Sequence, residues 1–134
     1  MIPRDRIAAV PQDISEESLM EIIETKKFSR YPVFKKSIDH ITGFVHAKDL
    51  LRLKGSASRK KFPTIKSILR KPTFISEGRN ALSVLIQFQK NKSHIGIVTN
   101  SHGKTVGMVT LEDILEELFG EIMDETDREG KNNA

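Results

Sequence analysis

Gly107-Met-Val-Thr110-Leu-Glu-Asp113-Ile-Leu-Glu-Glu-Leu-Phe-Gly120 is the stretch that decides the fold, because a strand pattern passes directly into a helix pattern. The apolar residues before Thr110 predict a strand, and those after it recur at helical spacing, which predicts a helix with one buried stripe. Thr110 stands at the N-cap position and Asp113 at the third helical position, where both favour helix initiation. The predicted stripe comprises Ile114, Leu115, Leu118, Phe119, Ile122 and Met123.

The same junction supports two interpretations. A strand that leads into a helix N-terminus presents backbone N–H groups to an anion, so Thr110 could join a phosphate shell. The two oxygens of Asp113 could accept hydrogen bonds from both hydroxyls of a ribose. Alternatively, both residues only cap the helix, as capping signals commonly do.

A second copy of the pattern lies upstream. Gly43-Phe-Val-His46-Ala-Lys-Asp49 has the same spacing, and both Gly43 and Asp49 precede their counterparts by 64 residues. We also match Val33 with Ile97. A period of this length indicates two copies of one supersecondary unit.

The rest of the pattern predicts a β-α-β-β-α order in each repeat. Strands are expected at 7–10, 32–34 and 41–46 in the first repeat, and at 74–75, 95–99 and 105–110 in the second. Ser15 begins a helix with Leu19, Ile22 and Ile23 on its buried face, and the helix over 81–91 is expected to bury Leu82, Leu85 and Ile86. We divide the chain into a first repeat (1–54), a basic linker (55–64), a second repeat (65–124) and a polar acidic tail (125–134).

The predicted fold class is α/β (α+β), with the two repeats packed about a pseudo-twofold axis. One repeat has too few strands to bury its sheet face alone, whereas two repeats packed face to face can do so. The symmetry predicts two equivalent clefts between the repeats.

Composition limits the function classes. Hydrophobic residues make up 37% of the chain, there is no cysteine, and no run approaches a membrane-spanning length. Eight Lys or Arg and no acid lie between Arg52 and Lys71, and nine acids lie against one Arg between Glu112 and Glu129. A nucleic-acid-binding surface would have aromatic residues among the basic ones, and Phe62 is the only aromatic residue in this basic block. Nucleic-acid binding is therefore not expected. The four His residues are scattered without ligand spacing, so neither a metal site nor an enzyme is predicted.

The chain resembles a tandem pair of cystathionine-β-synthase (CBS) domains, a Bateman module. It is most similar to the module of the CorC/HlyC hemolysin-related family and its animal relatives, the CNNM magnesium-transport mediators. The residues that carry the resemblance extend over nearly the whole chain: Met1-Ile-Pro-Arg4, Phe28-Ser-Arg-Tyr-Pro-Val33, Gly43 to Leu51, Lys92-Ser-His-Ile95 and Val106 to Glu121. Because the chain opens inside one of these motifs, we expect it to be part of a longer protein.

The resemblance implies a nucleotide between the start of one repeat and the Thr-x-x-Asp motif of the other. Thr110 would bind phosphate or ribose, Asp113 would bind the ribose hydroxyls, and Arg30 could reach phosphate. The residues expected to hold the adenine are Ile2, Pro3, Phe28, Ser29, Tyr31 and Pro32. The second, weaker cleft would use His46, Asp49, Pro72, Phe74, His94, Ile95 and Gly96. His46 replaces the hydroxyl residue and is near neutral at pH 7, so we predict that only the Thr110 cleft is occupied.

The expected function is a regulatory binding module that senses ATP or AMP, with or without magnesium. It would act as a homodimer on the cytoplasmic side, attached to a membrane or transporter-associated domain of the parent protein. The apolar residues Leu118, Phe119, Ile122 and Met123 are the expected dimer contact. The alternative function is a ligand-free structural dimerisation scaffold.

Overall fold

The computed structural model describes residues 1–54 and 65–120. The predicted linker at 55–64, the tail at 125–134, and Ile122 and Met123 of the predicted dimer contact lie outside the described residues. The boundaries of the two repeats remain predictions.

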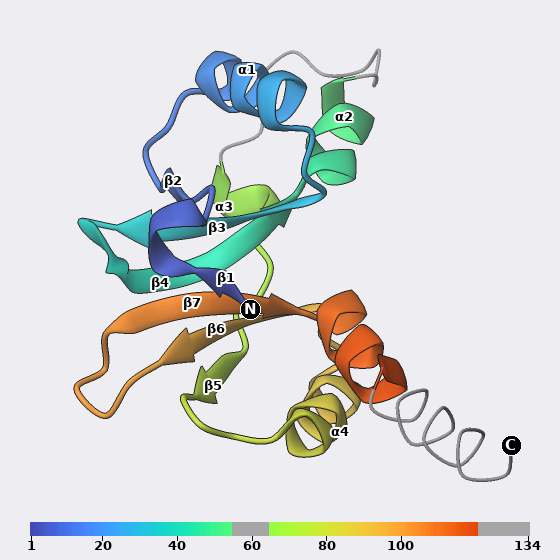
Figure 1. The fold of residues 1–134 in the computed structure, drawn as a ribbon. Coiled ribbons are helices and arrows are strands. Elements are labelled where there is room, and N and C mark those ends of the chain that lie inside the picture. The colour runs from blue at the N-terminus through green and yellow to red at the C-terminus, as the bar shows by residue number, and fades with distance from the viewer. Residues whose placement is uncertain (55–64, 121–134) are drawn as a thin grey trace, which may run out of the picture.

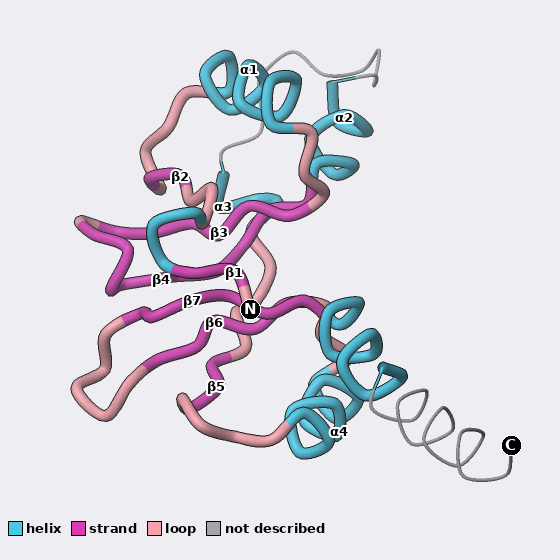
Figure 2. The backbone as a smooth tube through the Cα atoms, viewed as in Figure 1, coloured by secondary structure: helices cyan, strands magenta, loops and turns pink. Residues whose placement is uncertain are grey.

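Two sheets face one another, and helices cover their outer sides (Figure 1). The first part of the chain forms β1 (Ile2–Pro3), η1 (Arg4–Arg6), β2 (Val10–Pro11), α1 (Glu16–Lys26), β3 (Arg30–Lys35), β4 (Ser37–His46) and α2 (Ala47–Lys54). The second part forms α3 (Ile65–Ile68), β5 (Phe74–Ser76), α4 (Ala81–Asn91), β6 (Ile95–Thr99), β7 (Thr105–Thr110) and a helix that includes residues 111–120. Figure 2 separates these helices and strands by colour.

The two repeats are confirmed by equivalent strand pairings. In the first sheet, β2 runs parallel to β3 and β3 antiparallel to β4, and β5, β6 and β7 repeat this order in the second. In both long hairpins, the pairing register shifts directly after the residue that pairs with the repeated glycine. Gly43 pairs with Val33, and Gly107 pairs with Val98. The residue of the second repeat that is structurally equivalent to Val33 is therefore Val98, rather than the Ile97 matched from the sequence.

The N-terminal strand was not anticipated. Residues Ile2 and Pro3 form β1, which pairs antiparallel with β7 and therefore adds a strand to the sheet of the other repeat. Gly107 permits this close approach, because a Cβ at that position would lie 2.7 Å from the carbonyl oxygen of Ile2. The strand expected at 7–10 is correspondingly short, and only Val10 of that range lies in β2.

Three groups of buried side chains hold the fold together. One lies between α1, α2, α3 and the first sheet, and another lies between α4, the helix at 111–120 and the second sheet. The third joins the two sheets and consists of Ile41, Phe44, Ile95, Ile97 and Met108. Burial of this third group removes the apolar sheet faces from water, which favours the packing of the two repeats against each other.

The buried face of α4 differs from the prediction. Val84 and Phe88 are buried, whereas Leu82 and Ile86 are each 56% exposed. In the helix at 111–120, Ile114 is buried and Leu118 packs on the same core, while Leu115 and Phe119 are exposed. Both helices carry apolar residues on two faces, so the spacing alone did not identify the buried one.

Candidate functional site

A cavity of about 600 Å³ lies between the repeats, at the end of β7 where the predicted nucleotide site was placed. A volume of this order can hold a small organic ligand. Its walls come from β1, η1, the α1–β3 connection, the adjoining ends of β3, β6 and β7, and the helix after β7. The lining residues are Ile2, Arg6, Ala8, Phe28, Ser29, Arg30, Ile95, Met108, Thr110 and Glu112. We call this space the Thr110 cavity.

The helix N-terminus at the Thr110 cavity is capped as the sequence predicted. The Thr110 Oγ1 accepts a hydrogen bond of 3.2 Å from the backbone N–H of Asp113, and the N–H of Leu111 donates to the His94 carbonyl at 2.8 Å. The Thr110 hydroxyl proton remains available to a ligand. Asp113 is half-buried, does not line the cavity, and makes no side-chain hydrogen bond with the described residues.

An aromatic side chain stands at the wall formed by the α1–β3 connection. The Phe28 ring is 52% exposed, and the backbone N–H of Phe28 donates a 2.9 Å hydrogen bond to the Tyr31 hydroxyl. The two ring centroids lie 6.2 Å apart. Tyr31 itself is fully buried, so its ring supports Phe28 from behind and does not reach the cavity.

Only some of the other residues predicted to hold the adenine line the cavity. Ile2 and Ser29 line the cavity, whereas Pro3 and Pro32 do not. Pro3 is exposed in β1, and Pro32 is buried within β3. Arg30 is half-buried, and within residues 1–54 and 65–120 its guanidinium forms no hydrogen bond or ion pair. Arg30 also lines the neighbouring cavity described next.

A second cavity of about 540 Å³ lies on the other side of Arg30. Its lining residues are Arg30, Phe44, Arg70, Lys71, Pro72, Thr73, Asn91, Lys92, Ser93 and His94. Of the residues predicted for the second cleft, Pro72 and His94 line this cavity, whereas His46, Asp49, Phe74 and Gly96 do not. Ile95 lines the Thr110 cavity instead, because β6 crosses between the two spaces.

The strand-to-helix junction at His46 and Asp49 differs chemically from the one at Thr110 and Asp113. Both carboxylate oxygens of Asp49 accept hydrogen bonds from Arg70, each at 2.9 Å. The His46 Nδ1 accepts the N–H of Lys48 at 3.2 Å and so caps α2. Burial lowers the pKa of the His46 imidazole, and the positive charges of Arg30, Arg70 and Lys48 lower it further. His46 is therefore a neutral cap near pH 7.

An ionic contact fixes the N-terminal wall of the Thr110 cavity. Arg4 pairs with Asp39 of β4 and also donates to the Thr105 carbonyl at 2.9 Å. Asp39 accepts the Thr105 N–H at 3.0 Å, so one carboxylate joins η1, β4 and β7. The hydrogen bond from Arg4 holds the pKa of Asp39 below its ordinary value. This contact holds the segment that carries Ile2 and Arg6 against the second sheet.

Sequence reasoning missed four lining residues: Arg6, Ala8, Met108 and Glu112. Glu112 lies between the two residues that define the motif, so a closer reading of the first helical turn would have found it. Arg6 and Ala8 had no local signal, because their position depends on the pairing of β1 with the distant β7.

Neither a metal centre nor a membrane helix is seen in the part of the chain that the structure describes. No three His, Asp or Glu side chains there lie close enough together to bind a metal ion. None of the described helices is both long and apolar enough to cross a bilayer.

Two curated relatives resemble almost the whole chain. UPF0053 protein YhdP of Bacillus subtilis is 36% identical over 127 residues, which cover 95% of this chain and 29% of that protein. Magnesium and cobalt efflux protein CorC of Vibrio cholerae is 35% identical over 129 residues, which cover 96% of this chain and 44% of that protein. The chain thus spans less than half the length of these relatives.

Solved structures agree with this fold. The CBS domain of a putative transporter from Clostridium difficile has a TM-score of 0.81 and 38% identity, with 90% of this chain and 91% of that chain covered. The CBS domain of the bacterial CNNM/CorC family Mg²⁺ transporter in complex with ATP has a TM-score of 0.81 and 36% identity, covering 90% and 84%. A CBS-domain pair with bound AMP from Klebsiella pneumoniae has a TM-score of 0.78 and 26% identity, covering 89% and 94%.

The model of the CBS domain family matches residues 1–56 and again residues 65–120. Apart from β1 and α3, which each pack on the sheet of the other repeat, these matches coincide with the two equivalent sheets and their covering helices. The chain is therefore a tandem pair of CBS domains and belongs to the CBS domain family, with relatives among CorC, hemolysin C and the CNNM/CorC Mg²⁺ transporters.

Proposed function

We propose that the chain is a regulatory module that binds an adenine nucleotide, ATP or AMP, in the Thr110 cavity. The observation that supports this most strongly is the arrangement of its walls, with the exposed Phe28 ring on one repeat and a helix N-terminus on the other. Phe28 offers a stacking face for a base, and Thr110 offers a hydroxyl beside the helix dipole for phosphate. The ATP and AMP complexes of similar CBS domains support the ligand class.

Each predicted site residue receives a role in this proposal. Ile2 and Ser29 flank the base, and Tyr31 fixes the Phe28 backbone. Asp113 accepts hydrogen bonds from the ribose hydroxyls, which its uncommitted carboxylate allows. Pro3 and Pro32 hold the backbone of β1 and β3 beside the cavity, without a side-chain contact to the ligand.

Glu112 affects whether the nucleotide binds together with magnesium. Glu112 lines the same cavity as Arg6 and Arg30. A carboxylate near phosphate oxygens is repulsive unless a cation stands between them, and Mg²⁺ favours such carboxylate and phosphate oxygens. We therefore propose that magnesium strengthens binding of ATP more than binding of AMP.

Nucleotide would act by a population shift. A ligand that touches both repeats stabilises one mutual arrangement of them, by no more than its difference in affinity for the two arrangements. The attached membrane or transporter-associated domain of the parent protein would respond to that arrangement on the cytoplasmic side. The greater length of the relatives supports an attached domain.

The module would work as a homodimer. Leu82, Ile86, Leu115 and Phe119 are 47–65% exposed on two helices that share one core. Covering such residues by a second copy would remove apolar surface from water. We expect Phe119→Ser to convert a dimer to a monomer in sedimentation experiments, whereas a wild-type chain that sediments as a monomer would rule the dimer out.

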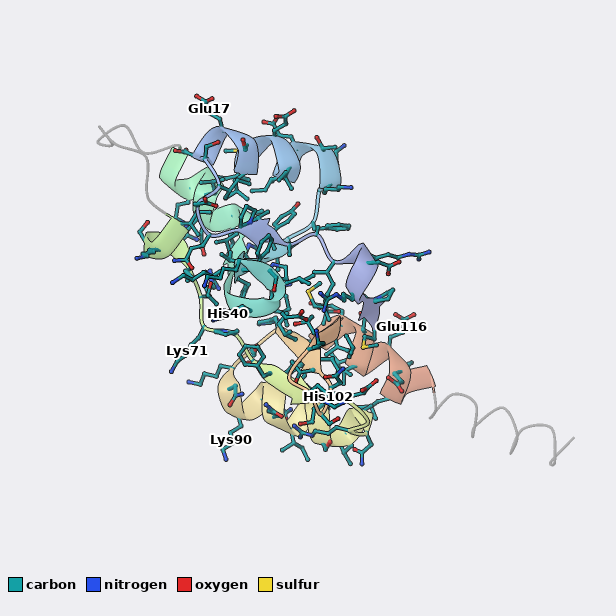
Figure 3. All side chains as sticks on the ribbon, turned by 90° about the vertical axis from the view of Figure 1, so that its left-hand side faces the viewer. Glu17, His40, Lys71, Lys90, His102 and Glu116 are labelled. Carbon is teal, nitrogen blue, oxygen red and sulfur yellow. The ribbon has the colours of Figure 1, made fainter. Side chains whose placement is uncertain are left out.

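The experiment that tests the nucleotide proposal is calorimetric titration with ATP and AMP, with and without magnesium. Asp113→Ala should weaken binding by roughly ten- to a hundredfold, because hydrogen bonds to a charged group contribute about 1.5–3 kcal/mol. Glu116→Ala is the matched control, since it removes the same charge from the same helix at a position that is exposed, whereas Asp113 is half-buried (Figure 3). If no adenine nucleotide binds and Asp113→Ala changes stability alone, the capping contact at Thr110 favours the structural scaffold instead.

A further inference from the structure

The second cavity has an unusual concentration of positive charge. Four of its lining residues are basic, namely Arg30, Arg70, Lys71 and Lys92, and no Asp or Glu belongs to its lining. Asp49 neutralises Arg70. Within the described ranges, the charged groups of Arg30, Lys71 and Lys92 have no ion-pair partner. We call this space the cationic cleft.

The cationic cleft lacks the groups that recognise a nucleoside. A ribose would need a free carboxylate at the position of Asp49, but both oxygens already accept hydrogen bonds from Arg70. The Nδ1 of the neutral His46 is used to cap α2. The aromatic residue in the wall, Phe44, is 8% exposed because it belongs to the core between the sheets, so it offers no face for a base.

The end of α4 does not oppose an anion here. Helix C-termini normally present unpaired carbonyl groups, which repel negative charge. At this end, Lys92 adopts a left-handed conformation and its N–H donates to the carbonyls of Phe88 and Gln89. The N–H of Ser93 also donates to Phe88 at 2.9 Å. Two carbonyls of the last turn are thus already hydrogen-bonded, and the Lys92 ammonium adds a positive charge.

We propose that the cationic cleft binds a phosphate group that carries no nucleoside into it. The planar guanidinium of Arg30 and the two ammonium groups match the oxygens of a phosphate. Two sources supply this chemistry: free inorganic phosphate or pyrophosphate, and the distal phosphates of a nucleotide held in the Thr110 cavity. Arg30 lines both spaces, so it is the residue through which occupancy of one affects the other. The nucleotide source rests on the proposed function, whereas the free source does not.

Titration of the whole chain with pyrophosphate, AMP and ATP at fixed ionic strength tests this proposal. We expect the double variant with Lys71→Gln and Lys92→Gln to weaken pyrophosphate binding at least tenfold. Lys90→Gln is the control, because it removes one positive charge from α4 at a position outside the lining; Figure 3 labels Lys71 and Lys90. Asp113→Ala should leave pyrophosphate binding unchanged.

The outcomes separate the two sources. Pyrophosphate binding that depends on Lys71 and Lys92 supports the free source, and it stands even if no nucleotide binds. Failure of pyrophosphate to bind, with ATP but not AMP weakened by the double variant, supports the nucleotide source. If neither pyrophosphate nor ATP responds to the two lysines, or if pyrophosphate binding is lost in Asp113→Ala, the proposal is overturned.

Discussion

The two strand-to-helix junctions share one spacing but present different chemistry. At the first, His46 caps α2 with a ring nitrogen and Asp49 is held by Arg70. At the second, Thr110 caps with a hydroxyl, and the Asp113 carboxylate accepts no hydrogen bond from the residues that the structure describes. A repeated motif therefore conserves the way a helix begins, while the neighbours of its carboxylate decide whether that carboxylate is free for a ligand.

Removal of the exposed ring should give the largest difference between the junctions. Phe28→Ala should weaken nucleotide binding by about 1–3 kcal/mol, roughly five- to 150-fold, because base–aromatic stacking contributes this much. Phe74→Ala removes a similarly exposed ring (47% against 52%) that lines neither cavity. Calorimetry should show unchanged affinity for this control, and equal losses in both variants would contradict the assigned cavity.

The two repeated glycines allow each junction to be disturbed separately. A Cβ at Gly107 would lie 2.7 Å from the Ile2 carbonyl oxygen, and one at Gly43 would lie 2.5 Å from the Arg70 carbonyl oxygen. Each Gly→Ala variant should lose about 1–3 kcal/mol of unfolding free energy in urea denaturation, as overpacking does. Only Gly107→Ala should also weaken nucleotide binding, since it displaces β1.

Gly120 is the control for these two substitutions, because a Cβ there meets nothing within 4 Å. Gly120→Ala should leave nucleotide affinity unchanged and should not reduce stability. If Gly43→Ala weakened nucleotide binding as much as Gly107→Ala, the two junctions would not be separable in this way.

The carboxylate of the first junction should matter little for ligand binding. Asp49→Ala removes the ion pair with Arg70, whose side chain is 43% exposed, so stability should fall by about 0.5–1 kcal/mol. Nucleotide affinity should stay within twofold of wild type, in contrast to Asp113→Ala. Thermal unfolding and calorimetry on the same samples check both parts. A tenfold loss of nucleotide affinity in Asp49→Ala would place the ribose beside Asp49 and contradict its assignment to Asp113.

The helix caps should differ in their response to pH. The pKa of His46 is lowered in the fold, so the unfolded chain takes up the proton first as the pH falls below about 6.5. Protonation of His46 therefore reduces stability between pH 7 and pH 5. His46→Asn retains a capping side chain without this titration, so its melting temperature should fall less over that range. Identical pH profiles would contradict the neutral-cap assignment.

Local patterns predicted the junctions well, because a cap and its helix are close in sequence. Thr110 accepts the Asp113 N–H as expected, and the repeat correctly predicted two equivalent sheets. Features that depend on distant contacts were missed. Arg70 lies 21 residues from Asp49, and nothing in the spacing indicated that the two would pair.

The remaining differences between the sequence prediction and the structure have three separate causes. The helix at 81–91 has apolar residues on two faces, and the prediction placed Leu82 and Ile86 in the core, where the structure has Val84 and Phe88. Burial of Tyr31 followed from its place in β3, which the aromatic character of the motif did not reveal. The sequence assigned Ile95 to the second cleft, whereas the structure places it in the lining of the Thr110 cavity, since both cavities adjoin the start of β6.

A crystal structure of the chain grown with ATP would test the central claim most directly, namely that one junction binds the nucleoside and the other does not. The account predicts adenosine density between Phe28 and Thr110, with the ribose beside Asp113 and the Asp49–Arg70 pair intact. Adenosine density beside His46 and Asp49, with the Thr110 cavity free of nucleotide, would contradict it.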